Sequence, residues 1–144
     1  MKDVIIVSGG NIQRDFALDF LQKNKKENAC LIAADKGVEF FVGTDWVPDV
    51  AVGDFDSLSS AGEKYLNTLK KTEIVRLKPE KDDSDTQSAM NYAIRTGAKK
   101  IVIFGVTGNR VDHLMANFGL LVLAQNQGAE VTLVDRYNYM KLIS

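Results

Sequence analysis

The chain has 144 residues, of which 45% are hydrophobic and 26% are charged, and 18 Lys and Arg against 19 Asp and Glu leave a formal net charge of −1. This balance argues against a nucleic-acid-binding protein, because contacts to many phosphates require clustered basic residues. The composition is that of one ordinary globular domain, and the single cysteine, Cys30, excludes an intrachain disulfide or a multi-cysteine zinc site.

No apolar run approaches the ~18 residues of a membrane-spanning helix, and the N-terminal apolar run is too short for a signal peptide. We therefore expect a cytoplasmic protein that has no membrane partner.

Short β-rich runs alternate with stretches of helical period along the chain. In order, the pattern predicts a strand at 4–8, a helix at 12–25, a strand at 29–34, a short helix at 38–42, a strand at 49–53, a helix at 61–69, a strand at 74–77, a helix at 85–96, a strand at 100–104, a helix at 112–127 and a strand at 130–134. Gly97 and Gly128 suit the ends of the last two helices. This alternation predicts an α/β fold: an open, mostly parallel, doubly wound sheet of about six strands with helices on both faces.

The last residues differ from the alternating pattern. Residues 137–144 begin another apolar run without a turn or polar tail. The pattern therefore stops in the middle of an element.

The loops that follow the predicted strands carry the polar and glycine residues. In an open parallel sheet, ligands bind outside the carboxyl ends of the strands. The loops at that edge are 8–11, 34–37, 53–57, 78–85 and 105–113, and each contains Gly or Asp. The sequence therefore predicts a binding site along this edge.

Asp54 and Asp56 follow a predicted strand and are separated by one residue. Both carboxylates can turn toward one point above the sheet and hold Mg²⁺, a hard cation that takes carboxylates together with substrate phosphates. The alternative is a turn in which Ser57 caps the next helix.

The acidic run 82–85 precedes another predicted helix. Closely spaced acids repel unless a cation or a helix N-terminus neutralises them. Helix capping explains one of these acids, and we favour a metal site shared with the Asp54 pair for the rest.

Two glycine-bearing loops, 8–10 and 105–108, lie at strand-to-helix turns, where free backbone N–H groups can bind phosphate oxygens. Arg110 near a helix N-terminus opposes the helix dipole unless an anion lies between them, although a solvated loop arginine is the alternative. Neither a dinucleotide-binding nor a P-loop glycine motif is present. His113, the single histidine, excludes a histidine-cluster metal site and either orients Asp112 or makes a structural hydrogen bond.

Four segments in this order and spacing resemble the catalytic domain of the thiamine pyrophosphokinase family. They are ADKG at 34–37, PDVAVGDFDS at 48–57, EKDDSDT at 80–86 and GVTGNRVDH at 105–113. The resemblance runs from residue 4 to about residue 138. It implies an Mg²⁺-dependent enzyme that transfers diphosphate from ATP to the hydroxyl of thiamine, giving thiamine diphosphate and AMP.

The resemblance also implies roles for residues of this chain. Asp54, Asp56 and Asp85 match the metal-binding acids, and Arg110 and Asp112 match a G-x-x-G-x-R-x-D-H segment in which Asn109 replaces a glycine. Asp82 and Asp112 are expected to orient or deprotonate the hydroxyl. The expected nucleotide contacts are Ser8, Gly9, Gly10, Asn11, Asp35, Gly37, Lys81, Ser84, Gly108, Arg110 and His113.

The family has a C-terminal β-sandwich domain that supplies part of the thiamine pocket across a homodimer. The chain ends at Ser144. The resemblance therefore implies that residues 1–137 form the nucleotide-binding catalytic domain and that residues 138–144 begin a truncated C-terminal β domain. We expect the chain to keep the nucleotide half of the site and to lack most of the acceptor half. Two other functions fit the residues: an Mg²⁺-dependent nucleotide-sugar transferase with an Asp-x-Asp site, and a nucleotide-binding module without catalysis.

Overall fold

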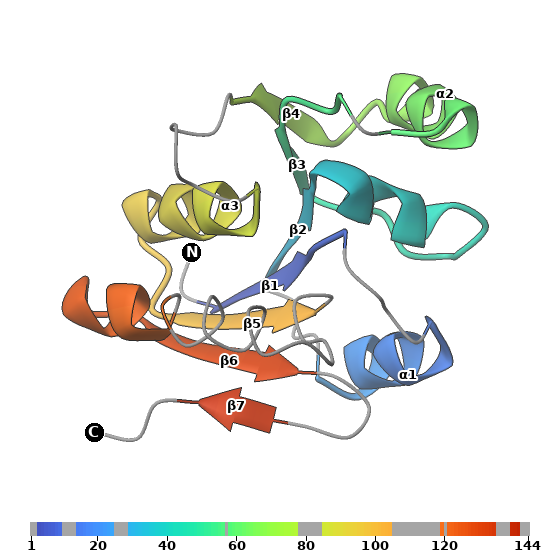
Figure 1. Ribbon diagram of the computed structural model, residues 1–144. Helices are drawn as coiled ribbons and strands as arrows, with labels where there is room; N and C mark the ends of the chain where they lie inside the picture. Colours follow the sequence, from blue (N-terminus) through green and yellow to red (C-terminus); the bar gives the residue numbers. More distant parts are fainter. Residues whose placement is uncertain are drawn as a thin grey trace.

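The computed structural model describes residues 3–9, 14–24, 29–56, 58–77, 85–104, 119, 121–134 and 139–141 (Figure 1). Its elements in chain order are β1 (Asp3–Val7), α1 (Arg14–Asn24), β2 (Cys30–Ala34), the 3₁₀ helix η1 (Asp35–Phe41), β3 (Val50–Gly53), α2 (Ser60–Thr68), β4 (Glu73–Arg76), α3 (Asp85–Arg95), β5 (Lys100–Phe104), β6 (Glu130–Val134) and β7 (Tyr139–Lys141). Residues 121–126 are also helical.

The described strands form one sheet in the order β4-β3-β2-β1-β5-β6-β7. All neighbours from β4 to β6 pair in parallel, and β7 pairs antiparallel with β6. The central strand β1 has partners from distant parts of the chain, because Val4 is opposite both Cys30 and Ile101. The predicted open, mostly parallel sheet is confirmed, and an antiparallel edge strand adds to the six predicted strands.

Helices cover both faces of this sheet, as predicted (Figure 1). On one face, α3 and residues 121–126 bury Ala89, Met90 and Leu121 against alternate residues of the strands. On the other face, α1, η1 and α2 bury Leu21, Phe41 and Leu66 against the intervening residues. Since β1, β2 and β3 are covered on both sides, their residues are almost all buried.

The two predicted helix-ending glycines have the expected geometry. Gly97 has a φ of 101° and Gly128 a φ of 82°. The N–H of Ala98 donates to the Ala93 carbonyl at 3.1 Å, and the N–H of Ala129 donates to the Ala124 carbonyl at 3.0 Å. These bonds satisfy helix-terminal carbonyls in the way that only a left-handed residue permits.

Three sequence expectations need correction or extension. The short helix predicted at 38–42 is a 3₁₀ helix that begins at Asp35, directly after β2. The pattern predicts a sheet with helices on both faces, but β4 is the exposed edge of that sheet, and Ile74 is 38% exposed. Residues 139–141 pair with β6, and the expected domain division at residue 138 stays a prediction.

None of the described helices is both long enough and apolar enough to cross a membrane.

Candidate active site at the carboxyl edge of the sheet

The parallel strands bring three predicted site residues to one edge of the sheet. Ser8 directly follows β1, Asp35 directly follows β2 and Asp54 directly follows β3. These three strands are neighbours in the sheet. The topology therefore gathers segments that lie far apart in the sequence along the edge where ligands of such folds bind.

Asp35 is a buried carboxylate in this edge. Its residue is 3% exposed, and its Oδ1 accepts a hydrogen bond from the backbone N–H of Phe55 at 2.8 Å. Asp35 also has a φ of 49°, the left-handed region that few residues other than glycine adopt. This conformation turns the chain from β2 straight into η1 and carries the carboxylate to the end of β3.

Gly53, the last residue of β3, leaves room for that carboxylate. A Cβ atom at Gly53 would lie 2.6 Å from the Asp35 Oδ1 and closer still to its Cγ. Gly53 also has a φ of 142°, which side-chain-bearing residues rarely adopt. Both the space and the backbone require glycine here.

The segment from Asp54 to Asp56, which we name the acidic turn, follows Gly53. Asp54 Oδ1 accepts the N–H of Asp56 at 3.1 Å, and Phe55 between them has a φ of 63°. Asp54 is half-buried and Asp56 is exposed, whereas Phe55 is buried in the core. The buried Phe55 side chain therefore fixes the turn to the core, and the two acids on either side of it lie at the carboxyl edge of the sheet, accessible to solvent.

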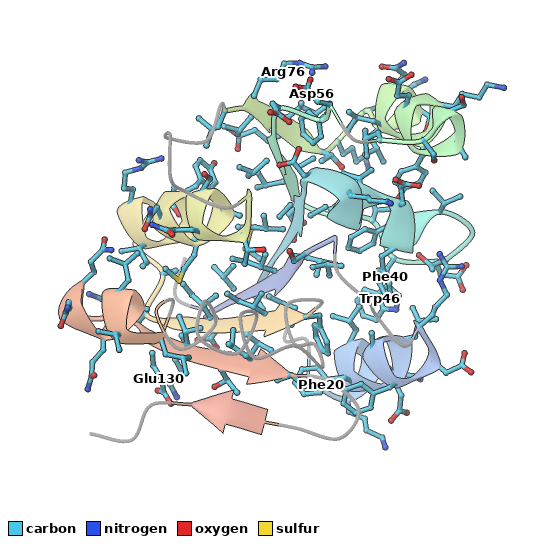
Figure 2. The ribbon with its side chains drawn as sticks, in the orientation of Figure 1. Phe20, Phe40, Trp46, Asp56, Arg76 and Glu130 are labelled. Carbon is cyan, nitrogen blue, oxygen red and sulfur yellow. The ribbon has the colours of Figure 1, made fainter. Side chains whose placement is uncertain are left out.

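Arg76 borders the acidic turn on the side of β4. Its guanidinium carbon lies 5.4 Å from the centroid of the Phe55 ring, in the range of a cation–π contact. Figure 2 shows Arg76 and Asp56 at the same end of the sheet, and Arg76 is paired in register with Gly53. Sequence analysis missed this arginine, because nothing in the local pattern indicates which side of a strand faces an aromatic ring.

The alternative to a metal site was a turn in which Ser57 caps the next helix, and Ser57 lies outside the described residues. The N-cap of α2 is Ser59, whose hydroxyl accepts the N–H of Gly62 at 3.2 Å. The Ser59 hydroxyl also donates to the Glu39 carboxylate at 2.6 Å. This pair links α2 to η1. The sequence pattern predicts a helix start at residue 61, whereas α2 begins at Ser60 and is capped by Ser59.

The start of α3 lies against the end of β1. The buried hydroxyls of Ser8 and Thr86 are hydrogen-bonded to each other. Thr86 is the second residue of α3, so the backbone of Asp85 lies at the same edge as Ser8. The position of α3 is consistent with the prediction that Asp85 belongs with the acidic turn, although its side chain is not among those described.

Two glycines assigned to nucleotide binding have a packing role in the structure. A Cβ atom at Gly37 would lie 2.8 Å from the carbonyl carbon of Val7 and closer still to its oxygen. A Cβ atom at Gly9 would lie 2.7 Å from the Cβ of Lys36. Both glycines allow the end of β1 to approach η1 closely, and a role in phosphate binding stays a prediction.

Arg14, on α1, donates hydrogen bonds to carbonyl groups at the end of η1, away from the candidate site. Its Nη2 lies 2.8 Å from the Phe40 carbonyl oxygen and 3.1 Å from that of Val42, at the end of the 3₁₀ helix. Its guanidinium also lies 5.9 Å from the Phe40 ring centroid. A cation near helix-terminal carbonyls is favourable.

The remaining predicted site residues lie outside the described part of the chain. They are Gly10, Asn11, Lys81, Asp82, Ser84, Gly108, Arg110, Asp112 and His113. Among the described residues, no three His, Cys, Asp or Glu side chains are grouped to hold a metal ion. The metal site of Asp54, Asp56 and Asp85 therefore stays a prediction.

Comparison with known proteins identifies relatives of this chain. Residues 21–133 match the family model "Thiamin pyrophosphokinase, catalytic domain". A curated thiamine pyrophosphokinase from Bacillus subtilis is 30% identical over 144 residues, which are 99% of this chain and 64% of that protein.

Solved structures agree with this result. A crystal structure of thiamine pyrophosphokinase from Bacillus subtilis has a TM-score of 0.76 at 28% identity, covering 94% of this chain and 61% of that chain. The enzyme from Geobacillus thermodenitrificans has a TM-score of 0.71 at 29% identity, covering 92% of this chain and 59% of that one. This chain thus spans less than two thirds of the length of these relatives. The match over most of its residues shows that the chain belongs to the thiamin pyrophosphokinase family, in the part that forms the catalytic domain.

Proposed function

We propose that the chain carries the nucleotide-binding site of a Mg²⁺-dependent thiamine diphosphokinase. In this reaction the hydroxyl oxygen of thiamine bonds to the β-phosphorus of ATP, and the bond from that phosphorus to the oxygen bridging to the α-phosphate breaks. AMP leaves with that oxygen, and the hydroxyl proton passes to a base or to water. Family membership supports this reaction, while the activity itself is our proposal.

The observation that carries the proposal is the acidic turn at the carboxyl edge of β3. It presents two carboxylates, one half-buried and one exposed, on backbone anchored by the buried Phe55. Hard oxygen donors of this kind fit Mg²⁺, which uses one or two carboxylates plus substrate phosphates. Asp54 and Asp56 would hold the ion together with Asp85. When bound, Mg²⁺ neutralises charge on the triphosphate.

The chain's other residues position the substrates in this proposal. Arg110 and the N–H groups of the glycine loops hold phosphate oxygens, and Asp82 and Asp112 orient or deprotonate the hydroxyl. The nucleotide lies along the edge formed by 8–11 and the start of η1. We also propose that the protein is cytoplasmic and that the full enzyme is a homodimer.

The test is a calorimetric titration of the chain with ATP, with and without Mg²⁺, followed by incubation with thiamine and assay of AMP and thiamine diphosphate. We expect Mg²⁺-dependent ATP binding, and the formation of AMP and thiamine diphosphate in equal amounts. AMP formed together with thiamine diphosphate would establish the complete reaction.

The other outcomes separate the alternative functions. ATP binding without AMP would favour a nucleotide-binding module. A nucleotide-sugar transferase would produce no ATP-dependent AMP, and absence of Mg²⁺-dependent ATP binding would overturn the proposal.

A further inference from the structure

We propose that Asp35 is a positioning residue for the acidic turn, acting through the N–H of Phe55, and that it does not itself bind the nucleotide or the metal ion. This inference rests on the proposed function, and it replaces the nucleotide contact that the family resemblance implied for Asp35.

The burial of Asp35 is the first observation. At 3% exposure, the residue is less accessible than Asp54, which is half-buried, and Asp56, which is exposed. A buried carboxylate needs strong hydrogen-bond donors to offset its lost hydration. The Phe55 N–H at 2.8 Å is such a donor, and it belongs to the residue between the two surface acids.

The conformation of Phe55 is the second observation. A φ of 63° is unfavourable for a bulky aromatic residue, and such a conformation persists only where the surroundings hold it. Phe55 is held at its N–H by Asp35 and at its ring by the core and Arg76. Removing the acceptor would free the middle of the acidic turn and leave a buried N–H without its partner.

The space for the carboxylate is the third observation. Gly53 has no side chain, and the Asp35 carboxylate occupies the region where a Cβ atom would stand. The end of β2, the end of β3 and the acidic turn are therefore fitted to one another around this carboxylate. A residue so enclosed is placed to set the direction of the neighbouring acids.

Asp49 offers a matched control at the opposite edge of the same two strands. Its Oδ2 accepts the backbone N–H of Leu31 at 2.8 Å, just before β3 begins. It makes a carboxylate-to-amide bond between the same strands, far from the acidic turn, but Asp49 is exposed and its bond is only partly buried. Asp49→Ala therefore measures how the loss of a carboxylate-to-amide bond between these strands affects the stability, without a change at the acidic turn.

The experiment compares Asp35→Ala, Asp35→Asn and Asp49→Ala in the whole chain. Affinity for ATP in the presence of Mg²⁺ is measured by calorimetry, and thermal unfolding is measured without metal. We expect Asp35→Ala to weaken Mg²⁺-dependent ATP binding by about tenfold or more, the usual scale for an unpaired buried group. Asn keeps a carbonyl oxygen for the Phe55 N–H, so Asp35→Asn should recover most of this loss. Asp49→Ala should lower the melting temperature and keep the affinity.

Two results would overturn the inference. If Asp35→Asn binds as weakly as Asp35→Ala, the charge of Asp35 acts directly on the ligand. If Asp49→Ala loses as much affinity as Asp35→Ala, the effect is general destabilisation.

A measurement on the unmodified, metal-free chain keeps the test independent of variant folding and of ATP binding. Hydrogen exchange of the Phe55 amide should be at least about tenfold slower than that of Asp56, because its bond is buried whereas that of Asp56 to Asp54 is exposed. Equal exchange rates would contradict the positioning role. If the unmodified chain fails to bind ATP with Mg²⁺, the proposed function fails, and this measurement still decides whether Asp35 holds the turn.

Discussion

The two ends of β2 and β3 are closed by similar bonds and differ in the backbone around them. At the amino end, Asp49 accepts the N–H of Leu31, and neither residue has a positive φ. At the carboxyl end, Asp35 accepts the N–H of Phe55, and both residues have positive φ. The first bond joins ordinary backbone, whereas the second holds backbone that would otherwise relax. The comparison teaches that unusual conformation is concentrated where two acids are presented.

The largest effect is expected at the acidic turn itself. Asp54→Asn should reduce Mg²⁺-dependent ATP binding by about 100-fold or more, since even residues that merely support metal ligands cost 10–100-fold when changed. The melting temperature should change little, because Asp54 is half-buried and the amide can still accept the Asp56 N–H. Calorimetry and thermal melting measure the two quantities.

Asp45→Asn is the control for this prediction. Asp45 is exposed in the segment before β3, and the substitution removes the same charge. It should leave the affinity unchanged. An Asp54→Asn chain that binds like the unmodified one would remove Asp54 from the proposed metal site.

The close approach of η1 to β1 gives the next prediction. Gly37→Ala should lower the free energy of unfolding by about 3 kcal/mol, the upper part of the usual range for overpacking, because the added methyl group overlaps the Val7 carbonyl. Denaturant titration measures the change. Gly119→Ala is the control, since nothing lies within 4 Å of a Cβ atom there and the residue is helical. A Gly37→Ala chain as stable as the Gly119→Ala chain would contradict the packing at this edge.

At the amino end of the strands, Asp49→Ala should lower the free energy of unfolding by about 1 kcal/mol, the usual net contribution of a hydrogen bond, because Asp49 is exposed and its bond is only partly buried. Denaturant titration should show this loss. If Asp49→Ala lost more free energy of unfolding than Asp35→Ala, the bond at the carboxyl end would not be the one that holds strained backbone.

The smallest effect is expected at Tyr65 on α2, away from the edge. Its hydroxyl is buried and has no hydrogen-bond partner in the described part of the chain, and burial raises its pKa above the usual 10.0. The folded chain therefore keeps the phenolic proton at a pH where the unfolded chain releases it. The stability linked to this proton is complete below the unfolded pKa and is lost as the pH rises through the folded pKa.

Tyr65→Phe removes both the unpaired hydroxyl and this titration. At neutral pH the free energy of unfolding should stay within about 0.5 kcal/mol of the original, since no hydrogen bond is lost. As the pH rises above the unfolded pKa of 10.0, the unmodified chain should lose stability relative to the variant. Parallel denaturant titrations measure the difference, and identical pH dependence would show that the phenol is solvated.

Local pattern was enough to predict the regular elements. Residues 100–104 and 130–134 form strands with the predicted bounds, because short apolar β-rich runs that follow a helix-ending glycine have few other structures. The order of the strands did not follow from the local pattern, and so the exposed edge position of β4 was missed. Strand order depends on contacts between segments far apart in the chain.

The sequence predicted which loops form the candidate site, but it did not predict the hydrogen bonds between them. That Asp35 and Asp54 lie at one edge follows from parallel pairing alone. That Asp35 is buried and bonded to Phe55 depends on the left-handed conformation of both residues and on the space left by Gly53. The positive φ of two residues other than glycine has no signature in composition or periodicity.

The position of β1 in the sheet has a consequence for how the chain folds. β1 precedes the other described strands in the chain, yet it lies between β2 and β5, and Asp3 pairs with Lys100. During synthesis, β1 to β4 can pair with one another in chain order. The other edge of β1 stays unpaired until β5 is synthesised and α3, which connects β4 to β5, packs on the sheet (Figure 1). Such long-range parallel pairing forms slowly, and until it forms the unpaired strand edge can bind other chains and aggregate. We expect the nascent first half of this protein to depend on chaperones until β5 is in place.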